Sequence, residues 1–324
     1  EDEVKRLRKK FNFDNFNNFE FPNELLEEFK NMINIGNQHE TDWKNNLELY
    51  KQKYNDDYNE FMKYQNNTYN TNFLPKFDKD FGKKATRDMS SKCIKVINDN
   101  IQNLIVGSAD LSPSNKTITT TNIYNSNNYD GSYIHYGVRE HAMAAISNGI
   151  STYNIITIAS TFLMFINYCL ASIRLSALSK HRVIYVFTHD SVALGEDGPT
   201  HQPIESLLIL RGIPDLLTFR PADGNEVSAA YEISLNHNGP SCICLARQGT
   251  NQLDNLDKYE LIKKGAYNLY QDGADEDLKL IVLSTGSETC TVMECIKKYD
   301  LKNIRIVSMP CLELYELQND IYKE

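Results

Sequence analysis

The chain has 324 residues, of which 41% are hydrophobic, and its formal net charge at pH 7 is −9. This length suits about two domains, since a domain usually takes roughly 100–200 residues, and the apolar content excludes wholesale disorder. The acidic balance argues against nucleic acid as a partner, because binding phosphates requires an excess of Lys and Arg.

The chain also lacks the signals of membrane or secreted proteins. No apolar run reaches the roughly 20 residues of a membrane-spanning helix, and EDEVKRLRKK at the start has no apolar signal segment. The seven cysteines lie mostly inside apolar segments without C-x-x-C or zinc-ligand spacing, and Cys242 and Cys244 alternate like packed strand residues. We therefore expect a soluble cytoplasmic protein with reduced thiols, no membrane partner and no metal ligands.

Residues 1–84 are rich in Asn and aromatic residues and show no strand periodicity. Apolar residues recur at helical spacing in ELLEEFKNMI (24–33) and KNNLELYKQKYNDDYNEFMKY (44–64), and Pro22 suits a helix start. These patterns predict helices joined by polar loops, with a connecting arm over residues 1–55.

From Ala85 onward, short apolar runs alternate with helical patterns. Near-continuous apolar strands interleaved with helices predict an α/β fold, a mainly parallel sheet with helices on both faces, over residues 56–257. Asp223 and Glu226 have the spacing of a capping box, which indicates a helix start. The expected strands are 103–107, 132–138, 155–159, 182–187, 215–219 and 240–246, and the expected helices are 140–150, 162–179 and 225–236.

A further unit follows the turn-rich residues 271–277. LKLIVLSTGSE, TCTVMECIKKY and NIRIVSM predict a strand, a helix and a second strand, which is one βαβ unit. Because a single βαβ unit leaves its sheet unfinished, we expect residues 258–324 to be the truncated start of a third, α/β domain.

The densest polar cluster is THDSVALGEDGPTHQP, residues 188–203, which directly follows the expected strand 182–187. Open parallel sheets keep their ligand sites at the carboxyl ends of strands. Two His, two Asp and one Glu crowded there favour a site over an ordinary polar loop.

Two other patterns each allow a structural and a functional interpretation. Glu140, in GVREHAMA, either stabilises a helix N-terminus by about 0.3–1 kcal/mol or faces a ligand nitrogen. Phe162, Phe165 and Tyr168 recur every third residue, as one helix face of aromatics would, which is more often a core stripe than a binding surface.

Basic residues and hydroxyls also occur in turn-like settings, at Arg87, Ser114 and Arg247, where Arg suits phosphate but also an ordinary surface. Asp110 follows an expected strand. Asn66-Asn67-Thr68 and Asn115-Lys116-Thr117 match the glycosylation acceptor pattern, which we expect to be unused in a cytoplasmic chain. No P-loop, G-x-G-x-x-G or G-x-S-x-G pattern is present.

Taken in order, ATRDMS, GSADLSPSN, HYGVREHAMAAISNGI, STFLMFINY, THDSVALGEDGPTHQPIESL, RPADGNEVSAAY and ARQ resemble the transketolase family. The likeness runs through nearly the whole chain and is strongest over residues 85–248. One departure is visible, because the family often has Gly-Gly where this chain has Ala159 and Ser160.

The resemblance implies a thiamine diphosphate enzyme with the pyrimidine-binding fold of that family. It implies that Glu140 hydrogen-bonds the aminopyrimidine ring, that Phe162, Phe165 and Tyr168 surround that ring, and that Asp110 lies near the cofactor. Catalytic roles are implied for Glu140, His189 and His201. The implied sugar-phosphate contacts are Arg87, Ser114, His189, Asp197, His201 and Arg247.

In this family, thiamine diphosphate and Mg²⁺ are held by a G-D-G…N motif on a preceding domain, and the chain has no such motif. The resemblance therefore implies a fragment that lacks that upstream domain and the end of the C-terminal domain. In the family the active site is shared between the two subunits of a homodimer. Alone, the fragment is expected to be inactive.

The implied activity belongs to the pentose phosphate pathway. It is transfer of a two-carbon ketol group from a ketose phosphate, such as xylulose 5-phosphate, to an aldose phosphate. Dihydroxyacetone synthase, deoxyxylulose-phosphate synthase and a non-catalytic ligand-binding relative remain alternatives.

Overall fold

The computed structural model describes residues 1–65 and 69–324, so the first glycosylation pattern, at 66–68, lies outside the described residues. Contacts divide the chain into two compact units, residues 1–63 and 64–324. The asparagine of the second pattern, Asn115, is fully buried, which leaves its amide inaccessible to a glycosylating enzyme.

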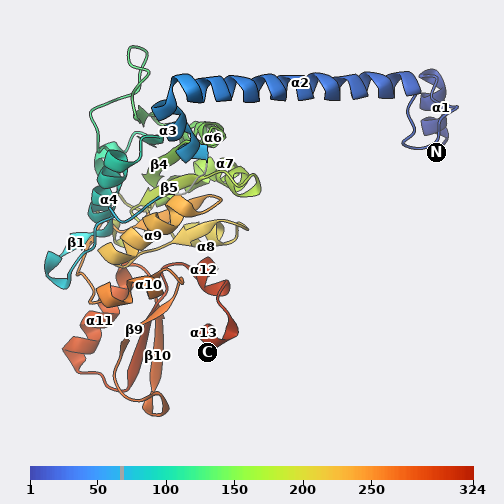
Figure 1. Cartoon of the computed structure of the whole chain (residues 1–324). Helices are drawn as coiled ribbons and strands as arrows, with labels where there is room; N and C mark the ends of the chain where they lie inside the picture. Colours follow the sequence, from blue (N-terminus) through green and yellow to red (C-terminus); the bar gives the residue numbers. More distant parts are fainter. Residues whose placement is uncertain (66–68) are drawn as a thin grey trace. The chain divides into compact units, whose positions relative to one another are not determined.

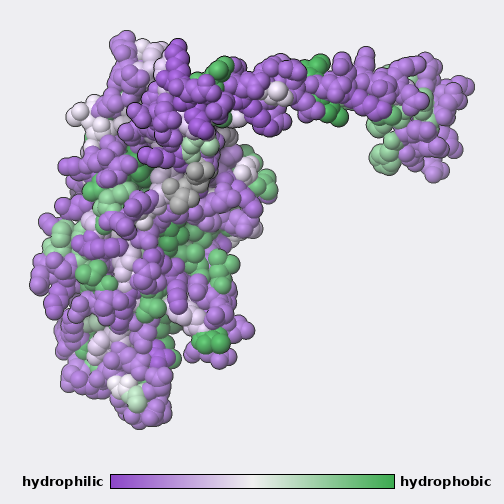
Figure 2. Space-filling view, viewed as in Figure 1, coloured by the Kyte–Doolittle hydropathy of each residue, from purple (hydrophilic) through white to green (hydrophobic). Residues whose placement is uncertain are grey.

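The first unit is helical, as predicted, but its helices are divided differently. It contains α1 (Asp2–Lys10) and the long α2 (Asn23–Lys53), and α3 (Asn55–Gln65) begins in it. The helix expected at 24–33 continues without a loop, because Gly36 costs only about 1 kcal/mol in a helix and no Pro interrupts. The pattern at 44–64 breaks at Tyr54, whose backbone is not helical. No residue of α2 is buried, and Figure 2 shows its mostly hydrophilic surface.

The second unit carries the α/β architecture (Figure 1). Its strands are β1 (Lys84–Ala85), β2 (Leu104–Ser108), β3 (Tyr133–His135), β4 (Ile156–Phe162), β5 (Val183–Thr188), β6 (Leu217–Phe219), β7 (Ser241–Leu245), β8 (Gly249–Thr250), β9 (Tyr267–Gln271), β10 (Leu280–Ser284) and β11 (Ile304–Ser308). Its helices are α4 (Thr86–Asn100), α5 (Ser112–Asn115), α6 (Glu140–Ser151), α7 (Ile166–Leu178), α8 (Ser206–Arg211), α9 (Gly224–Asn236), α10 (Tyr259–Ile262), α11 (Ser287–Tyr299), α12 (Leu312–Glu316) and α13 (Asp320–Lys323).

A six-stranded sheet in the order β3-β2-β4-β5-β7-β6 forms the centre of this unit, and every neighbouring pair is parallel. The predicted fold class is thereby confirmed. Strand β5 explains why both faces are covered: Ile184 and Val186 belong to one core cluster, whereas Tyr185 and Phe187 belong to the other. Successive strand residues point to opposite faces, so a continuous apolar run needs helices on both sides.

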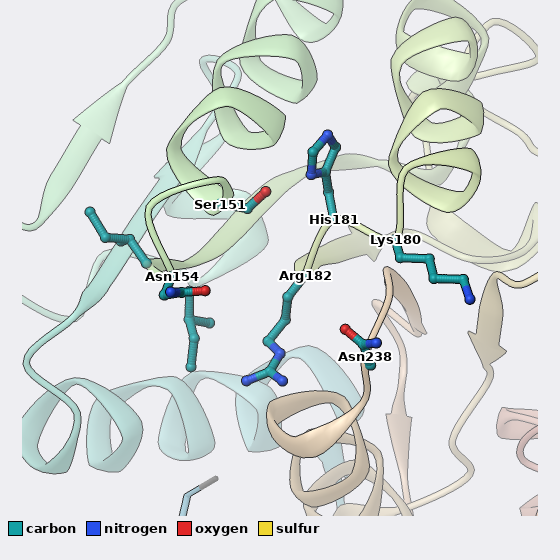
Figure 3. A pocket seen from close by; sticks show the side chains of 8 residues that line it. Ser151, Asn154, Lys180, His181, Arg182 and Asn238 are labelled. Carbon is teal, nitrogen blue, oxygen red and sulfur yellow. The ribbon is translucent and has the colours of Figure 1, made fainter. Parts of the chain in front are cut away.

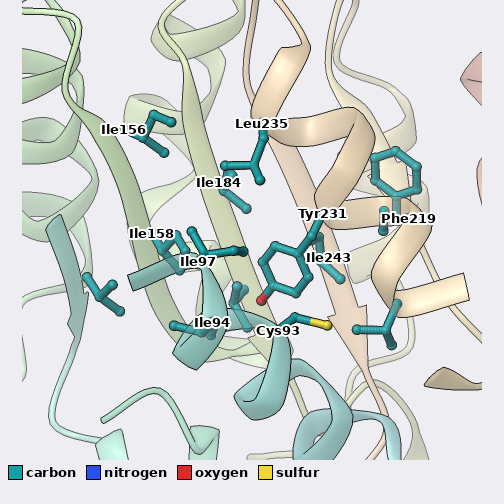
Figure 4. Packing of buried hydrophobic residues seen from close by; sticks show 14 of the residues in the cluster. Cys93, Ile94, Ile97, Ile156, Ile158, Ile184, Phe219, Tyr231, Leu235 and Ile243 are labelled. Atoms are coloured by element: carbon teal, nitrogen blue, oxygen red, sulfur yellow. The ribbon is translucent and has the colours of Figure 1, made fainter. Parts of the chain in front are cut away.

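The first of these cores lies between the sheet and helices α4 and α9 (Figure 4). Ile94 and Ile97 of α4 and Tyr231 of α9 pack there against sheet isoleucines, and all three are fully buried. The second core lies between the opposite sheet face and helices α6 and α7, where Met143 and Ile173 are fully buried. Burial of aliphatic side chains of this size contributes about 1.5–3 kcal/mol each.

The helix expected at 162–179 starts later than predicted, and this is a correction. Phe162 is the last residue of β4, Leu163–Phe165 form a 3-10 turn, and α7 begins only at Ile166. Phe162, Phe165 and Tyr168 therefore do not share one α-helix face. The i, i+3 spacing still aligns the side chains across the turn, because a 3-10 helix has three residues per turn.

Other local predictions are confirmed. The Asp223 carboxylate accepts a hydrogen bond from the Glu226 backbone N–H at 3.0 Å and caps α9. Cys242 and Cys244 are both buried in the second core. The strand expected at 132–138 is shorter, because only Tyr133–His135 pair with β2.

The C-terminal part contains the predicted βαβ unit, since β10 and β11 pair in parallel and α11 connects them. The prediction missed β9, which pairs antiparallel with the other edge of β11. Its apolar residues Tyr267 and Leu269 join Ile306 of β11 in a third core cluster that includes Ala229 of α9. Among the described residues no helix is long and apolar enough to cross a membrane, and the expected cytoplasmic location stays a prediction.

Candidate functional site

The predicted site residues gather where the parallel strands end. Phe162 closes β4, His189 directly follows β5, and Arg247 follows β7. These three strands are neighbours in the sheet, and parallel strands end at the same edge. Residues that follow three separate strands in the sequence therefore lie together at one edge of the sheet.

The aromatic residues form a continuous row with both loop histidines. The ring centroids of Phe162 and Phe165 are 5.8 Å apart and stacked, and those of Phe165 and Tyr168 are 6.0 Å apart. Phe162 lies 3.7 Å from His189, and Phe165 lies 5.2 Å from His201. The planes of neighbouring rings differ by 10° to 67°, so the row is not one flat surface. An aromatic ligand could still pack against its rings, because ring pairs stabilise by about 0.5–1.5 kcal/mol beyond area burial.

His189 is held in a strained and buried position. Its φ of +61° is in the left-handed region, and only 3% of the residue is exposed. Thr188 Oγ1 lies 2.8 Å from its Nδ1. Burial, followed by the positive charges of Arg87 and Arg247, lowers the pKa of His189 to about 4. The imidazole is therefore neutral at pH 7 and can donate one hydrogen bond and accept another.

Two arginines border this histidine and give the edge a positive charge. Arg87, on the first turn of α4, donates from Nη1 to the Ser114 carbonyl at 2.8 Å and lies 3.5 Å from His189 Nε2. Burial lowers the pKa of Arg87, and nearby Arg247 lowers it further. A Cβ at Gly195, whose φ is +114°, would meet Arg247 Nη1 at 2.9 Å. Glycine at 195 thus leaves room for the second guanidinium.

His201 and Asp197 complete the loop after β5. Thr200 Oγ1 lies 2.8 Å from His201 Nδ1, which leaves the Nε2 side available to a ligand. Asp197 is exposed, and its negative charge partly opposes the lowering of the His189 pKa. The carboxylate therefore lies within electrostatic range of His189.

Glu140 and Asp110 follow the two strands at the β3 edge of the sheet. Glu140 is the first residue of α6 and is 8% exposed. Burial raises the pKa of Cys169 on α7, and the negative charge of Glu140 raises it further. Glu140 therefore lies near α7, the helix that carries Tyr168. Asp110 follows β2 with a φ of +62° and is exposed. Both positions agree with the predicted placement at strand ends.

The residues that replace the expected glycine pair are accommodated inside β4. Ala159 and Ser160 are fully buried, and Ser160 Oγ donates to the Gly107 carbonyl at 2.9 Å. Thr117 Oγ1 lies 3.0 Å from the same hydroxyl. The hydroxyl is therefore part of the bonding that joins β2 to β4.

Sequence reasoning missed a buried amide that connects the strand ends. Asn115 Nδ2 donates to Ser108 Oγ at 3.1 Å, and Asn115 Oδ1 accepts from Thr188 Oγ1 at 2.7 Å. Thr188 in turn contacts His189. The sequence signal that could have identified Asn115 was its place in SPSN, directly after Ser114.

It also missed a cluster of charges next to the loop, in which Arg220 and Asp190 are buried and Glu288 is exposed. Arg220 Nε donates to Asp190 Oδ2 at 2.9 Å, and its Nη2 lies 2.8 Å from Glu288 on α11. Arg220 follows β6 immediately, so its position after a strand was the sequence signal. Among residues 1–65 and 69–324, no group of three or more His, Cys, Asp or Glu is arranged to hold a metal ion.

The fold is a parallel α/β domain, and the candidate site lies at the carboxyl ends of its strands. Residues 82–252 match the transketolase pyrimidine-binding domain, and residues 1–69 match the transketolase thiamine diphosphate binding domain. Because the first match covers more than half of the chain, the chain belongs to the transketolase family.

Curated relatives agree over nearly all of this chain. Transketolase 2 of Saccharomyces cerevisiae is 40% identical across 99% of the chain and 49% of its own length. The transketolase of Aquifex aeolicus is 38% identical across 99% of the chain and 47% of its own length. The chain therefore spans about half the length of the curated relatives it matches.

Solved structures give the same result. Transketolase from Leishmania mexicana superposes with a TM-score of 0.88 at 35% identity, over 99% of this chain and 48% of that one. A Pichia stipitis transketolase in complex with sedoheptulose-7-phosphate gives 0.89 at 34% identity, over 99% and 49%. A split-gene transketolase, described as an inactive beta4 tetramer, gives 0.55 at 26% identity, over 70% of each chain.

Proposed function

We propose that the protein to which this chain belongs is a transketolase that moves a two-carbon ketol group from a ketose phosphate to an aldose phosphate. The carrying observation is the contact of Phe162 with His189 at 3.7 Å, with Arg87 3.5 Å from the same imidazole. The aromatic rings suit a ring cofactor. The neutral imidazole and the guanidinium beside them suit the hydroxyls and the phosphate of a phosphorylated sugar.

The residues at this edge fit the pyrimidine half of thiamine diphosphate. Phe162, Phe165 and Tyr168 would contact the ring, Glu140 would accept a hydrogen bond from a ring nitrogen, and Asp110 would lie close by. A buried carboxylate is suited to this, because a hydrogen bond to a charged group contributes about 1.5–3 kcal/mol. When bound, the cofactor supplies the carbon nucleophile and the electron sink.

The substrate would bind along the cationic side of the site. Arg87, Arg247 and Ser114 suit its phosphate, because guanidinium groups form paired hydrogen bonds with phosphate oxygens. His189, with its pKa lowered to about 4, would hydrogen-bond sugar hydroxyls without adding charge. His201 and Asp197 would bind the remaining hydroxyls, and His201 would exchange a proton at Nε2 with a sugar oxygen.

The diphosphate and Mg²⁺ would be held by a domain outside this chain, which has no G-D-G…N motif. We further propose a homodimer in which one subunit supplies that half and its partner supplies the pyrimidine half. The chain alone is then inactive, and the description of the split-gene relative as inactive supports this part of the proposal.

The test is Glu140→Ala in the longer protein, assayed at saturating thiamine diphosphate and Mg²⁺ with xylulose 5-phosphate as donor. Removing a charge-assisted hydrogen bond of about 1.5–3 kcal/mol lowers turnover at least about tenfold, since 1.4 kcal/mol corresponds to one factor of ten. Glu276→Ala, at an exposed position, is the control. Unchanged turnover in Glu140→Ala would sink the assignment.

Substrate assays of the same longer protein distinguish transketolase from the related activities. Turnover with ribose 5-phosphate as acceptor supports the transketolase, whereas turnover with formaldehyde or pyruvate instead would indicate dihydroxyacetone synthase or deoxyxylulose-phosphate synthase.

Calorimetry tests the fragment: we expect weak or undetectable binding of thiamine diphosphate with Mg²⁺ to this chain. Tight one-to-one binding would contradict the missing-half proposal.

A further inference from the structure

The turn between β10 and α11 is joined by hydrogen bonds to two loops of the candidate site. The turn consists of Thr285 and Gly286, and α11 begins at Ser287. One connection ends at the residue that follows His189, and the other ends at the residue that follows Arg247. Two loops that follow different strands, β5 and β7, are thus connected to one short segment of the C-terminal part.

The first connection runs through Arg220, whose side chain is 8% exposed. Its Nε donates to Asp190 Oδ2 at 2.9 Å, and its Nη1 donates to the Thr285 carbonyl at 3.1 Å. Its Nη2 lies 2.8 Å from a carboxylate oxygen of Glu288. Because the donors of a guanidinium point in fixed directions, these bonds set where the Asp190 carboxylate lies relative to the turn. Asp190 directly follows His189 in the chain.

The second connection runs through Gln248, which directly follows Arg247. Its Nε2 donates to Ser287 Oγ at 2.9 Å, and Ser287 is 7% exposed. The Ser287 hydroxyl in turn donates to the Glu288 carboxylate at 3.3 Å. The two connections therefore meet at the first turn of α11, where Glu288 bonds to both Ser287 and Arg220.

The turn approaches Arg220 more closely than a side chain would allow. Gly286 has a φ of +63°, and a Cβ there would lie 2.8 Å from both Cζ and Nε of Arg220. The Gly286 N–H donates to the Arg220 carbonyl at 2.9 Å, and Thr285 Oγ1 donates to the same carbonyl at 3.3 Å. The backbone and the side chain of Arg220 are thus both bound to this turn, which glycine makes possible.

We propose that the turn between β10 and α11 positions His189 and Arg247 for a ligand, with Arg220 and Gln248 acting as positioning residues. The coupling belongs to this chain by itself, whereas its effect on turnover rests on the proposed function. His189 has a φ of +61°, and a non-glycine residue keeps such a backbone only where its surroundings hold it. If these bonds only joined two parts of the unit, their loss would change stability and leave the site as it is.

The first experiment uses the double variant Ser287→Ala/Glu288→Ala of this chain. The variant loses one hydroxyl and one carboxylate that is 54% exposed, so the chain should remain folded. We expect NMR titration to show the pKa of His189 rising from about 4 toward 6.5, because the imidazole loses part of its burial. The main groups that act on this imidazole are Arg87, Arg247, Asp197 and His201. Neither altered residue is one of them, so a changed pKa reports a movement of His189.

Two control variants test whether the effect is specific to this turn. Glu294→Ala removes another carboxylate of α11, one whose partner is Asn251 Nδ2, beyond β8, at 2.7 Å. Lys180→Gln changes an exposed residue beyond the opposite, amino end of β5, where Lys180 lines a small polar cavity (Figure 3). Both controls are expected to leave the His189 titration unchanged.

The second experiment measures the kinetics of the longer protein with the same double variant. The KM for xylulose 5-phosphate should rise at least about tenfold, because small displacements of binding groups cost this much or more. The KM for thiamine diphosphate should stay close to its original value, because Glu140 follows β3 and Arg220 follows β6, at opposite ends of the strand order. Glu288→Gln keeps an oxygen that can accept from Arg220, so it should change both readouts less than Glu288→Ala does.

The outcomes separate this proposal from the proposed function. A folded double variant with an unchanged His189 titration overturns the positioning role, as does an equal change in Glu294→Ala. An unchanged KM for the sugar phosphate in an active enzyme also overturns it. If the titration changes but the longer protein transfers no ketol group, the positioning is right and the proposed function is wrong.

Discussion

The guanidinium of Arg220 and the carboxylate of Asp190 form a buried ion pair, with 2.9 Å between Arg220 Nε and Asp190 Oδ2. Asp190 adjoins His189, whereas Arg220 also bonds the Thr285 carbonyl and Glu288. The pair thus connects the loop after β5 to the elements around α11. Even beside Arg220, burial raises the pKa of Asp190, so this carboxylate depends on its partner to remain charged.

Arg220→Met is expected to lower the free energy of unfolding by about 3–5 kcal/mol, because it leaves a buried carboxylate without its cation. Urea denaturation of this chain measures the loss. Glu288→Ala removes the other partner, whose side chain is 54% exposed, and should cost no more than about 1 kcal/mol. Similar losses in both variants would show that burial of Asp190 is not the cause.

His189 is expected to stay neutral down to a pH of about 4, as measured by NMR titration of its ring. Arg87→Met removes the second-largest cause of the lowering, so the pKa should rise but stay below the ordinary 6.5 because burial remains. Since the unfolded chain binds this proton first, His189 reduces stability as the pH falls from 6.5 to about 4. Lys297→Met should leave the titration unchanged.

Asp223 and Glu226 should produce the opposite pH dependence. Both carboxyls are fully buried, and burial raises the pKa of each above the usual values of 3.8 and 4.5. The folded chain therefore binds these two protons more tightly than the unfolded chain does. The stability that the two carboxyls contribute falls as the pH rises above their ordinary pKa values of 3.8 and 4.5.

Glu226→Gln should make stability depend less on pH, because one of the two titrating groups is gone. Tyr267 and Ser308, which now donate to Glu226 Oε1 at 2.9 and 2.6 Å, carry hydroxyls that can instead accept from the amide. Denaturation series from about pH 4 to pH 8 compare the slopes. An equal change in exposed Glu276→Gln would contradict the assignment.

Two glycine substitutions should have opposite signs. A Cβ at Gly107 in β2 would lie 2.4 Å from the Tyr136 ring and 2.6 Å from the Ile134 carbonyl, so Gly107→Ala should destabilise by about 1–3 kcal/mol. Gly149 in α6 has open space around it, and Gly149→Ala should stabilise by up to about 1 kcal/mol. Thermal unfolding of both variants checks the prediction, and a destabilising Gly149→Ala would contradict it.

Local pattern determined most of the architecture of this protein. The continuous apolar run at 182–187 predicts a strand buried on both faces, and β5 is one. The Asp223 and Glu226 spacing predicts the cap of α9, which begins at Gly224, one residue before the expected range. Both features depend on residues only a few positions apart, so hydrophobic periodicity and capping patterns in the sequence are enough to predict them. Phe162 was one exception, because the spacing of three that suggests an α-helix also fits a strand end followed by a 3-10 turn.

The sequence by itself determined the parallel α/β fold and indicated that polar residues after the strands would meet at one edge. The tertiary structure decided which of them touch: Phe162 on His189, Arg87 beside the same ring, and Arg220 on Asp190. Contacts of this kind depend on the order β4-β5-β7-β6, which brings together residues separated by long stretches of chain. Strand order is set by packing of the whole core, and no local pattern of side chains encodes it.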